Sequence, residues 1–198
     1  EYDEEPWFYR KDGKTLIIIL SMDQGFCGSF NQSIIDKSSE IVKSHPNAYI
    51  ETFGKKIEGI IKKNKAENCA KQAVSSRYDV VAFSNTLASL AFDYIANHEV
   101  NRVMVVSGEF KNVLVQKAKC TDVFSIDKFN FDNVEYTAVE GSRLEFIDDV
   151  FQAYLKKSFD AIITEHLVSE LSARVMAMDN SVKSANDMSE KLNALYNR

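Results

Sequence analysis

The sequence predicts an α/β protein, in which a small open sheet flanked by helices is followed by a long C-terminal coiled-coil helix. Residues 15–20 form a continuous β-branched and aliphatic run, which is typical of a strand buried on both faces. Strand-like and helix-like segments then alternate along the middle of the chain, as in α/β proteins. Residues 165–198 carry apolar side chains at coiled-coil spacing. These three observations define the class.

Composition limits the functions that need to be considered. The chain has 198 residues, of which 45% are hydrophobic, enough for one domain with a sizeable core and an extension. A net charge of −5 argues against a nucleic-acid partner. Three widely spaced cysteines indicate a reducing compartment. The longest apolar run, residues 16–20, is far too short to span a membrane, so the protein is expected to be soluble and at most peripheral to a membrane.

The first half of the chain is expected to run strand, helix, strand, helix. Residues 1–14 are charged and aromatic, and they predict an irregular, exposed lead-in before the strand at residues 15–20. Asn31 is expected to cap a helix over residues 32–43. A short strand follows at residues 49–53, and Gly54 begins a turn into a second helix. That helix covers residues 55–64, and nearby lysines give it an exposed basic face: Lys55, Lys56, Lys62, Lys63 and Lys65.

The second half continues the α/β pattern and ends in the helical arm. Residues 80–84 read as a third short run and residues 86–97 as a helix. Two strands are expected next, at residues 102–107 and 110–119, and a turn at Gly108 makes them antiparallel. Residues 122–136 are expected to be extended or loop. The predicted domains are therefore a Rossmann-like α/β domain over residues 15–140 and a helical arm over residues 141–198, with helix from residue 144.

The arm carries a seam that nothing else in the chain can cover. Eight positions alternate in spacing between four and three residues: Leu171, Val175, Met178, Val182, Ala185, Ser189, Leu192 and Tyr196. No Gly or Pro occurs after Gly141, so one helix can run through the whole seam. At 1.5 Å per residue this helix would be ~50 Å long. The other predicted helices are shorter. A partner chain, or a piece of this protein outside these residues, is therefore expected to pack there; the start at Glu1 fits a fragment.

Two candidate sites favour structural interpretations over chemistry. The turn Gly25-Phe26-Cys27-Gly28 follows a strand, but it lacks both the three-glycine dinucleotide fingerprint and a P-loop. Asp23 and Cys27 could act as acid and thiol nucleophile, yet no histidine lies near them in sequence to serve as the base. Glu165 and His166 lack the second histidine of a helical metal site, so a solvated helix face that includes Glu170 is favoured. No cofactor, metal or catalytic residue is predicted.

Two segments are distinctive: Ser-Met-Asp-Gln-Gly-Phe-Cys-Gly at residues 21–28, and Ser-Glu-Leu-Ser-Ala-Arg-Val-Met-Ala-Met-Asp at residues 169–179, followed by Tyr-Asn-Arg at residues 196–198. They resemble the gamma subunit of F-type ATP synthase, the central-stalk rotor. The family's turn reads Thr-Ser-Asp-Arg-Gly-Leu-Cys-Gly, and this chain has Ser-Met-Asp-Gln-Gly-Phe-Cys-Gly at residues 21–28. The family's C-terminal helix has the pattern Ser-Glu-x-x-Ala-Arg-Met-x-Ala-Met-Asp, ending in Tyr-Asn-Arg. Residues 169–179 match it with Val175 in place of the first Met, and residues 196–198 close it. Gln24 removes the basic side chain of the family's turn, and Ser181 and Ser184 are further departures.

The resemblance implies a non-catalytic rotor role. It implies alpha and beta subunits around the shaft, and an epsilon subunit and a ring of c subunits at the foot. It also implies that the family's N-terminal helix, and the last turns of its C-terminal helix, lie outside these residues. Residues expected to face the head or the N-terminal helix are Arg174, Met178, Asp179, Tyr196, Asn197 and Arg198. Residues expected to meet the c ring or epsilon are Val139, Glu140, Gly141, Ser142 and Arg143.

The resemblance also implies a location, and two other functions stay open. The rotor would be a peripheral protein associated with the membrane only through the complex, on the cytoplasmic face of the bacterial inner membrane or, alternatively, on the matrix face of the mitochondrial inner membrane. One alternative function is an α/β enzyme that binds a small ligand at the Asp23–Gly28 turn. The other is an adaptor that dimerises through its arm.

Overall fold

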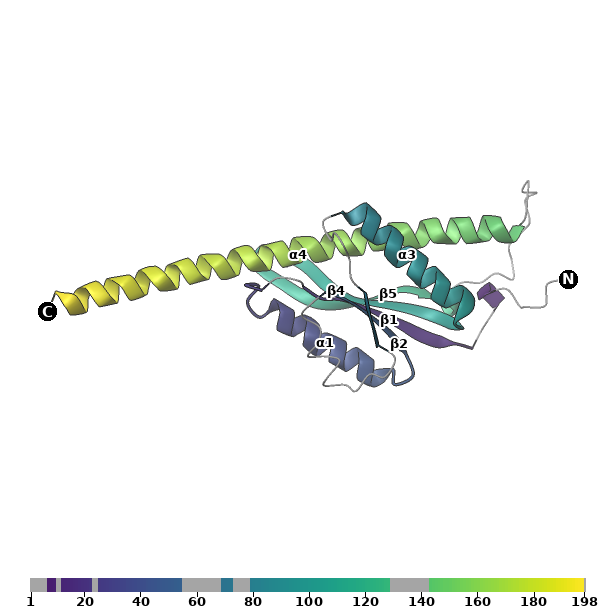
Figure 1. Cartoon of the computed structure of the whole chain (residues 1–198), viewed down its shortest axis with the longest axis horizontal. Coiled ribbons are helices and arrows are strands. Elements are labelled where there is room, and N and C mark those ends of the chain that lie inside the picture. Colours follow the sequence, from purple (N-terminus) through teal and green to yellow (C-terminus); the bar gives the residue numbers. More distant parts are fainter. Residues whose placement is uncertain are drawn as a thin grey trace.

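The computed structural model describes residues 7–9, 12–22, 25–54, 69–72, 79–128 and 143–197. A five-stranded sheet has the order β3-β2-β1-β4-β5, and the predicted α/β class with a long C-terminal helix is confirmed (Figure 1). The strands are β1 (Lys14–Leu20), β2 (Tyr49–Phe53), β3 (Cys69–Gln72), β4 (Val100–Asn112) and β5 (Val115–Ser125). The helices are α1 (Phe30–Ser44), α3 (Val80–Asn97) and α4 (Arg143–Tyr196), with 3-10 turns at Trp7–Tyr9 and Ile126–Lys128. Strand β5 is antiparallel to β4, and the other pairs are parallel.

Strand β1 is the centre of the core, as its composition predicts. Its side chains alternate between the two faces of the sheet because successive residues of a strand point in opposite directions. Ile17 and Ile19 pack beneath α1, whereas Leu16 and Ile18 pack beneath α3 and α4. All four are fully buried. The domain therefore has three layers, with α1 on one side of the sheet and α3 and α4 on the other (Figure 1).

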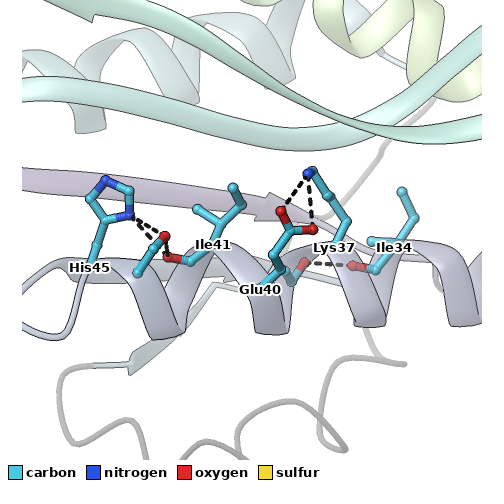
Figure 2. A network of polar contacts seen from close by, with 7 residues as sticks. Ile34, Lys37, Glu40, Ile41 and His45 are labelled. Carbon is cyan, nitrogen blue, oxygen red and sulfur yellow. Dashed lines mark hydrogen bonds and ion pairs between the residues drawn. The ribbon is translucent and has the colours of Figure 1, made fainter.

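Helix α1 begins at Phe30, two residues earlier than the sequence predicts, and ends at Ser44. Asn31 is not the cap; it lies inside the helix, and the capping position belongs to Ser29, whose side chain makes no capping bond. The reason is that Phe30 is buried against the sheet and draws the first turn back toward the strand. At the other end, His45 Nδ1 lies 3.0 Å from the carbonyl oxygen of Ile41 (Figure 2). That carbonyl can only accept, so Nδ1 donates to it and satisfies a carbonyl in the last turn of the helix.

Residues 80–84 are the first turns of α3, not a strand. The side chain of Asp79 accepts a hydrogen bond from the backbone N–H of Ala82 at 3.0 Å, and so caps the helix. The apolar run looked like a strand because it is short and β-branched, but Phe83 continues into Leu87 and Ala91 at helical spacing, and all three are buried. Helix α3 therefore begins six residues earlier than predicted. The predicted helix at 55–64 and its lysine cluster lie outside the described residues.

The two strands before the arm are antiparallel, as predicted, but their turn lies farther along the chain. Gly108 is inside β4, opposite Ala118, and the turn falls at Val113 and Leu114. Gly108 is in the strand because α4 crosses it closely, not because the chain reverses there. Strand β3 was not anticipated from the sequence, and β5 continues through Ser125, into the first of the residues that were expected to be extended or loop.

The described part of the lead-in is not simply an exposed tail. Phe8 is 4% exposed and belongs to the core beneath α4. The Trp7 ring lies 4.4 Å from that of Phe151, and Trp7 Nε1 donates to Asp148 at 2.8 Å. Both contacts are with the beginning of α4. The aromatic residues of the lead-in therefore hold the base of the long helix, and their burial outweighs the usual mobility of a chain end.

Candidate functional site

Helix α4 leaves the domain and continues alone. Its first part packs on the sheet and on α3, with Phe151, Leu155 and Phe159 buried. From Met178 onward every described residue of the helix is exposed. All eight residues of the seam are exposed as well, so nothing in the described part of the chain covers it. The predicted unbroken helix and its unpaired seam are both confirmed (Figure 1).

The exposed apolar edge begins earlier than the seam. Phe146, Val150 and Val168 are exposed on the same helix, and the last two are about five full turns apart, so they lie on one side of it. Val168 precedes Leu171 by three residues and therefore continues into the seam. The sequence contains this signal. It was missed because small and polar side chains interrupt the apolar pattern between Val150 and Val168.

The two motifs that carry the family resemblance meet where α4 leaves the domain. The Arg174 guanidinium lies 2.5 Å from Glu170 on the preceding helical turn and 3.8 Å from the Cys27 sulfur. The side chains of Glu170 and Arg174 are only 6% and 12% exposed. The backbone at Gly28 comes close to Ala177: a Cβ added at Gly28 would lie 3.9 Å from that of Ala177. The Arg174 guanidinium, held by an ion pair within α4 and shielded from water, thus contacts the strand-end turn through Cys27.

A second buried contact fixes α4 to the sheet. The backbone N–H of Gly108 donates to Nδ1 of His166 at 3.0 Å, so that ring nitrogen carries no proton. His166 and Glu170 are buried, with 3% and 5% of their surface exposed. The interpretation of this stretch as a solvated helix face is therefore wrong. The sequence pattern misled because His166 accepts a hydrogen bond from the Gly108 backbone and Glu170 pairs with Arg174, so neither side chain faces water.

The strand-end turn is built for packing. Phe26 and Gly28 have positive φ angles of 63° and 55°, and Phe26 points into solvent while Cys27 is buried. The Cys27 thiol donates to the carbonyl oxygen of Gly25 at 3.3 Å. Burial raises the pKa of Cys27, opposed by the nearby Arg174 charge and reinforced by that of Glu170. At neutral pH this residue is a thiol under a helix, which is a poor nucleophile. Asp23 lies outside the described residues.

Comparison with known proteins identifies the family of this chain. The sequence profile of the family described as ATP synthase matches residues 1–198. The ATP synthase gamma chain of Clostridium novyi (strain NT) is 28% identical over 200 residues, covering 98% of this chain and 70% of that relative. The gamma chain of Clostridium kluyveri is 29% identical, covering 95% and 67% respectively. The chain belongs to the ATP synthase gamma-chain family.

Solved structures share the family's fold. The rotor of the Euglena gracilis mitochondrial ATP synthase superposes with a TM-score of 0.70 at 16% identity, covering all of this chain and 78% of that one. The central stalk of the Tetrahymena thermophila mitochondrial enzyme gives 0.66 at 18% identity, covering 91% and 83%. Both matches extend over most of this chain. Domain and projecting helix are therefore a common arrangement in distant members of this fold.

Some of the residues expected to face partners are exposed on the free part of α4, one turns inward, and others lie outside the described residues. Met178, Asp179, Tyr196 and Asn197 are exposed on the free part of α4, and Asp179 pairs with Lys183 at 2.7 Å. Arg174 instead turns inward and anchors the helix, as described above. Two sets lie outside the described residues: Val139 to Ser142, and Arg198. Arg143 is the first residue of α4.

Two features are absent from the described residues. No helix among them is both long and apolar enough to cross a bilayer. No group of three or more acidic, histidine or cysteine side chains gathers there in a way that could hold a metal ion.

Proposed function

We propose that this chain is the central-stalk rotor subunit of an F-type ATP synthase, which couples ion-driven rotation of a membrane ring to conformational cycling of catalytic beta subunits. The observation that carries the proposal is the free part of α4. A helix with an exposed coiled-coil seam and no covering element in the described chain is suited to pack inside something larger. Membership of the gamma-chain family supplies the identity of that surrounding structure.

The anchorage of α4 suits a shaft that must transmit torque. A rotating foot can turn the helix only if the two do not slip, and directional contacts resist slipping better than apolar ones. The contact of Arg174 with Cys27 and the bond from Gly108 to His166 are two such contacts, and the Glu170–Arg174 pair within α4 holds the guanidinium in place. An asymmetric shaft then presents a different surface to each subunit around it. Differential contacts of that kind are how a rotation would bias nucleotide sites on the partners.

The partner contacts follow from this arrangement. Met178, Asp179, Tyr196, Asn197 and Arg198 would face the alpha and beta subunits or the second helix of the shaft. Arg174 contributes from inside, by holding the shaft to the foot. The segment from Val139 to Arg143 leads into the opposite end of α4 and would meet the c ring or the epsilon subunit. Nucleotide would bind to the partners. The complex would lie on the cytoplasmic face of a bacterial inner membrane, or on the matrix face in mitochondria.

Co-purification tests the proposal directly. The full-length subunit, expressed with tagged alpha and beta subunits, should be recovered with them in a complex that hydrolyses ATP. A matched variant with Leu192→Glu and Val182→Glu places charges in the seam and should lose recovery, whereas Asn180→Glu and Lys191→Glu on the same free part of the helix form the control. Failure of the unaltered subunit to co-purify would refute the rotor assignment.

The same preparation separates the two alternatives. An adaptor that pairs through its arm would sediment as a dimer without the other subunits. An enzyme with its site at the strand-end turn would bind a nucleotide or phosphorylated compound as an isolated chain. The buried thiol and the packed turn offer no support for that chemistry.

A further inference from the structure

The hairpin formed by β4 and β5 extends well past the rest of the sheet. The last residue of β4 that pairs with β1 is Val106, yet β4 continues to Asn112. Beyond Val106, among the described strands, β4 and β5 pair only with each other and form a two-stranded ribbon, which Phe30 of α1 and Ser169 of α4 cover at Gly108. Residues 111–115, at the outer end of the ribbon, are exposed, and a two-stranded ribbon is marginal in water unless something packs on it. A domain that needed only to complete its sheet would not require it.

Three consecutive apolar residues are displayed at the tip of this ribbon. Leu114 is 72% exposed and Val113 is 53% exposed, and the neighbouring Val115 is exposed too. The turn does not need them, because the Asn112 side chain accepts hydrogen bonds from the backbone N–H groups of Leu114 and Val115, at 2.9 Å each. Asparagine, glycine and aspartate are the residues that hairpin turns usually select. Turn geometry therefore explains Asn112 and leaves the apolar residues unexplained.

The tip is also held rigidly. Nε2 of Gln116 donates to the carbonyl oxygens of Asn112 and Val113, at 3.0 and 2.6 Å. Together with the two bonds to the Asn112 side chain, these contacts fix the whole turn. A surface whose shape is fixed before binding loses little conformational entropy when it docks.

The strand segments next to the tip are basic in sequence, although carboxylates pair with two of their lysines. Residues 110–119 contain three lysines, Lys111, Lys117 and Lys119, and no acidic residue, although the whole chain carries a net charge of −5. Glu109 pairs with Lys111, and Glu165 of α4 pairs with Lys119. Lys117 is exposed on the outer strand. An apolar tip beside lysine complements an apolar surface that carries carboxylates.

The position of the tip indicates what it would meet. Strand β4 and α4 run in the same direction. The hydroxyl of Tyr154 donates to Val123, which lies on β5 beside Val103 and Met104 near the beginning of β4, and His166, later in α4, accepts from Gly108, later in β4. Leu114 lies about 20 Å beyond Gly108 at ~3.3 Å per residue. Along α4 that distance corresponds to about 13 residues from His166. The tip is thus level with Met178 and Asp179, where α4 loses its last contacts with the domain.

We infer that the hairpin tip Val113-Leu114-Val115, with Lys117 beside it, docks on the subunits that surround the base of the shaft, through an apolar surface bordered by carboxylates. The inference rests on the proposed rotor function, because only that function puts a partner around α4 at this level. The membrane ring is not the occupant, since the tip points along α4 and away from the helix start at Arg143.

Photo-crosslinking in the assembled complex tests this surface. Leu114 is replaced by p-benzoylphenylalanine in the full-length subunit, which is then purified with the alpha and beta subunits and irradiated. A covalent product with alpha or beta is expected. The same replacement at Val81, an exposed valine at the start of α3, is the control and should give at least ~10-fold less product, because contact is required for the reaction. Lys117→Glu should reduce the Leu114 product about threefold or more, whereas Lys43→Glu on α1 should not.

Each outcome has one meaning. Co-purification without a crosslink from Leu114, equal products from Leu114 and Val81, or a product with the c ring or a second copy of this chain would overturn the docking surface and leave the rotor assignment intact. If the unaltered subunit does not co-purify with alpha and beta, the rotor assignment fails and the docking surface fails with it.

Discussion

Replacing Gly108 by alanine should loosen the attachment of α4 to the sheet. A Cβ at this position would lie 2.5 Å from Cζ of the Phe30 ring and 2.9 Å from Cβ of Ser169. Carbon atoms in ordinary contact are about 3.5–4.0 Å apart, so both neighbours would have to move by about an ångström. Phe30 is buried among the residues under α1, and Ser169 is fully buried on α4. Neither has space to move into.

The cost should be that of overpacking a core. Insertion of a methyl group into a well-packed site typically lowers the free energy of unfolding by about 1–3 kcal/mol. For a domain of this size each kcal/mol corresponds to roughly 2–4 °C in melting temperature. We expect Gly108→Ala to melt several degrees lower than the unaltered protein, measured by urea denaturation and by differential scanning calorimetry.

Gly25→Ala is the matched control, because a Cβ there would meet nothing within 4 Å. Both substitutions restrict the unfolded chain in the same way, so the difference between them isolates the clash. Phe30→Leu in the Gly108→Ala background should recover part of the loss. Equal stability of the two alanine variants, within about 0.5 kcal/mol, would refute the claim that close packing at this strand holds the shaft.

Three further outcomes follow from polar groups. Arg174→Ala leaves the Glu170 carboxylate buried without its guanidinium and should lower the free energy of unfolding, measured by urea denaturation, by about 3 kcal/mol. Lys183→Ala breaks an exposed pair with Asp179 at the same helical spacing and should lower it by less than about 0.5 kcal/mol. Similar losses in the two variants would contradict the anchoring role of Arg174. Tyr94→Phe removes the hydroxyl that donates to the buried carboxylate of Glu51 on β2 at 2.6 Å. It should lower the free energy of unfolding by about 1–3 kcal/mol in the same measurement. Burial raises the pKa of Cys27, so the unfolded chain loses its thiol proton first and this residue's contribution to stability falls as the pH rises above about 9. Iodoacetamide at pH 7.5 should therefore label Cys27 much more slowly in the folded than in the urea-unfolded protein.

Most of the fold could be predicted because its strongest elements have unambiguous patterns. Strand β1 is apolar at every position from Leu16 to Leu20 and the arm lacks glycine and proline after Gly141, so the sequence pattern alone identifies both. Residues 80–84 failed because a short β-branched run fits a strand and a buried helix equally well, and only the Asp79 cap distinguishes them. Gly108 failed because a glycine within a sequence more often marks a turn than a close helix crossing.

The candidate site was predictable in outline and not in orientation. The seam could be recognised as unpaired from its spacing and length. The inward direction of Arg174 and the burial of His166 could not, because both depend on contacts with Cys27 and Gly108, which lie 147 and 58 residues away in sequence. Polar residues on a helix normally indicate water, and only tertiary contacts reverse that expectation.

The length of α4 has a consequence for the local stability of the helix along its axis. The helix has 54 residues and measures about 80 Å, but only the part before Met178 is packed against the domain. Isolated helical segments in water are marginal, so the amide hydrogens of the remaining part should exchange with solvent orders of magnitude faster than those beside β4. A rod that is continuous in shape is therefore graded in rigidity along its axis, and its outer portion becomes stiff only when the enclosing assembly grips it.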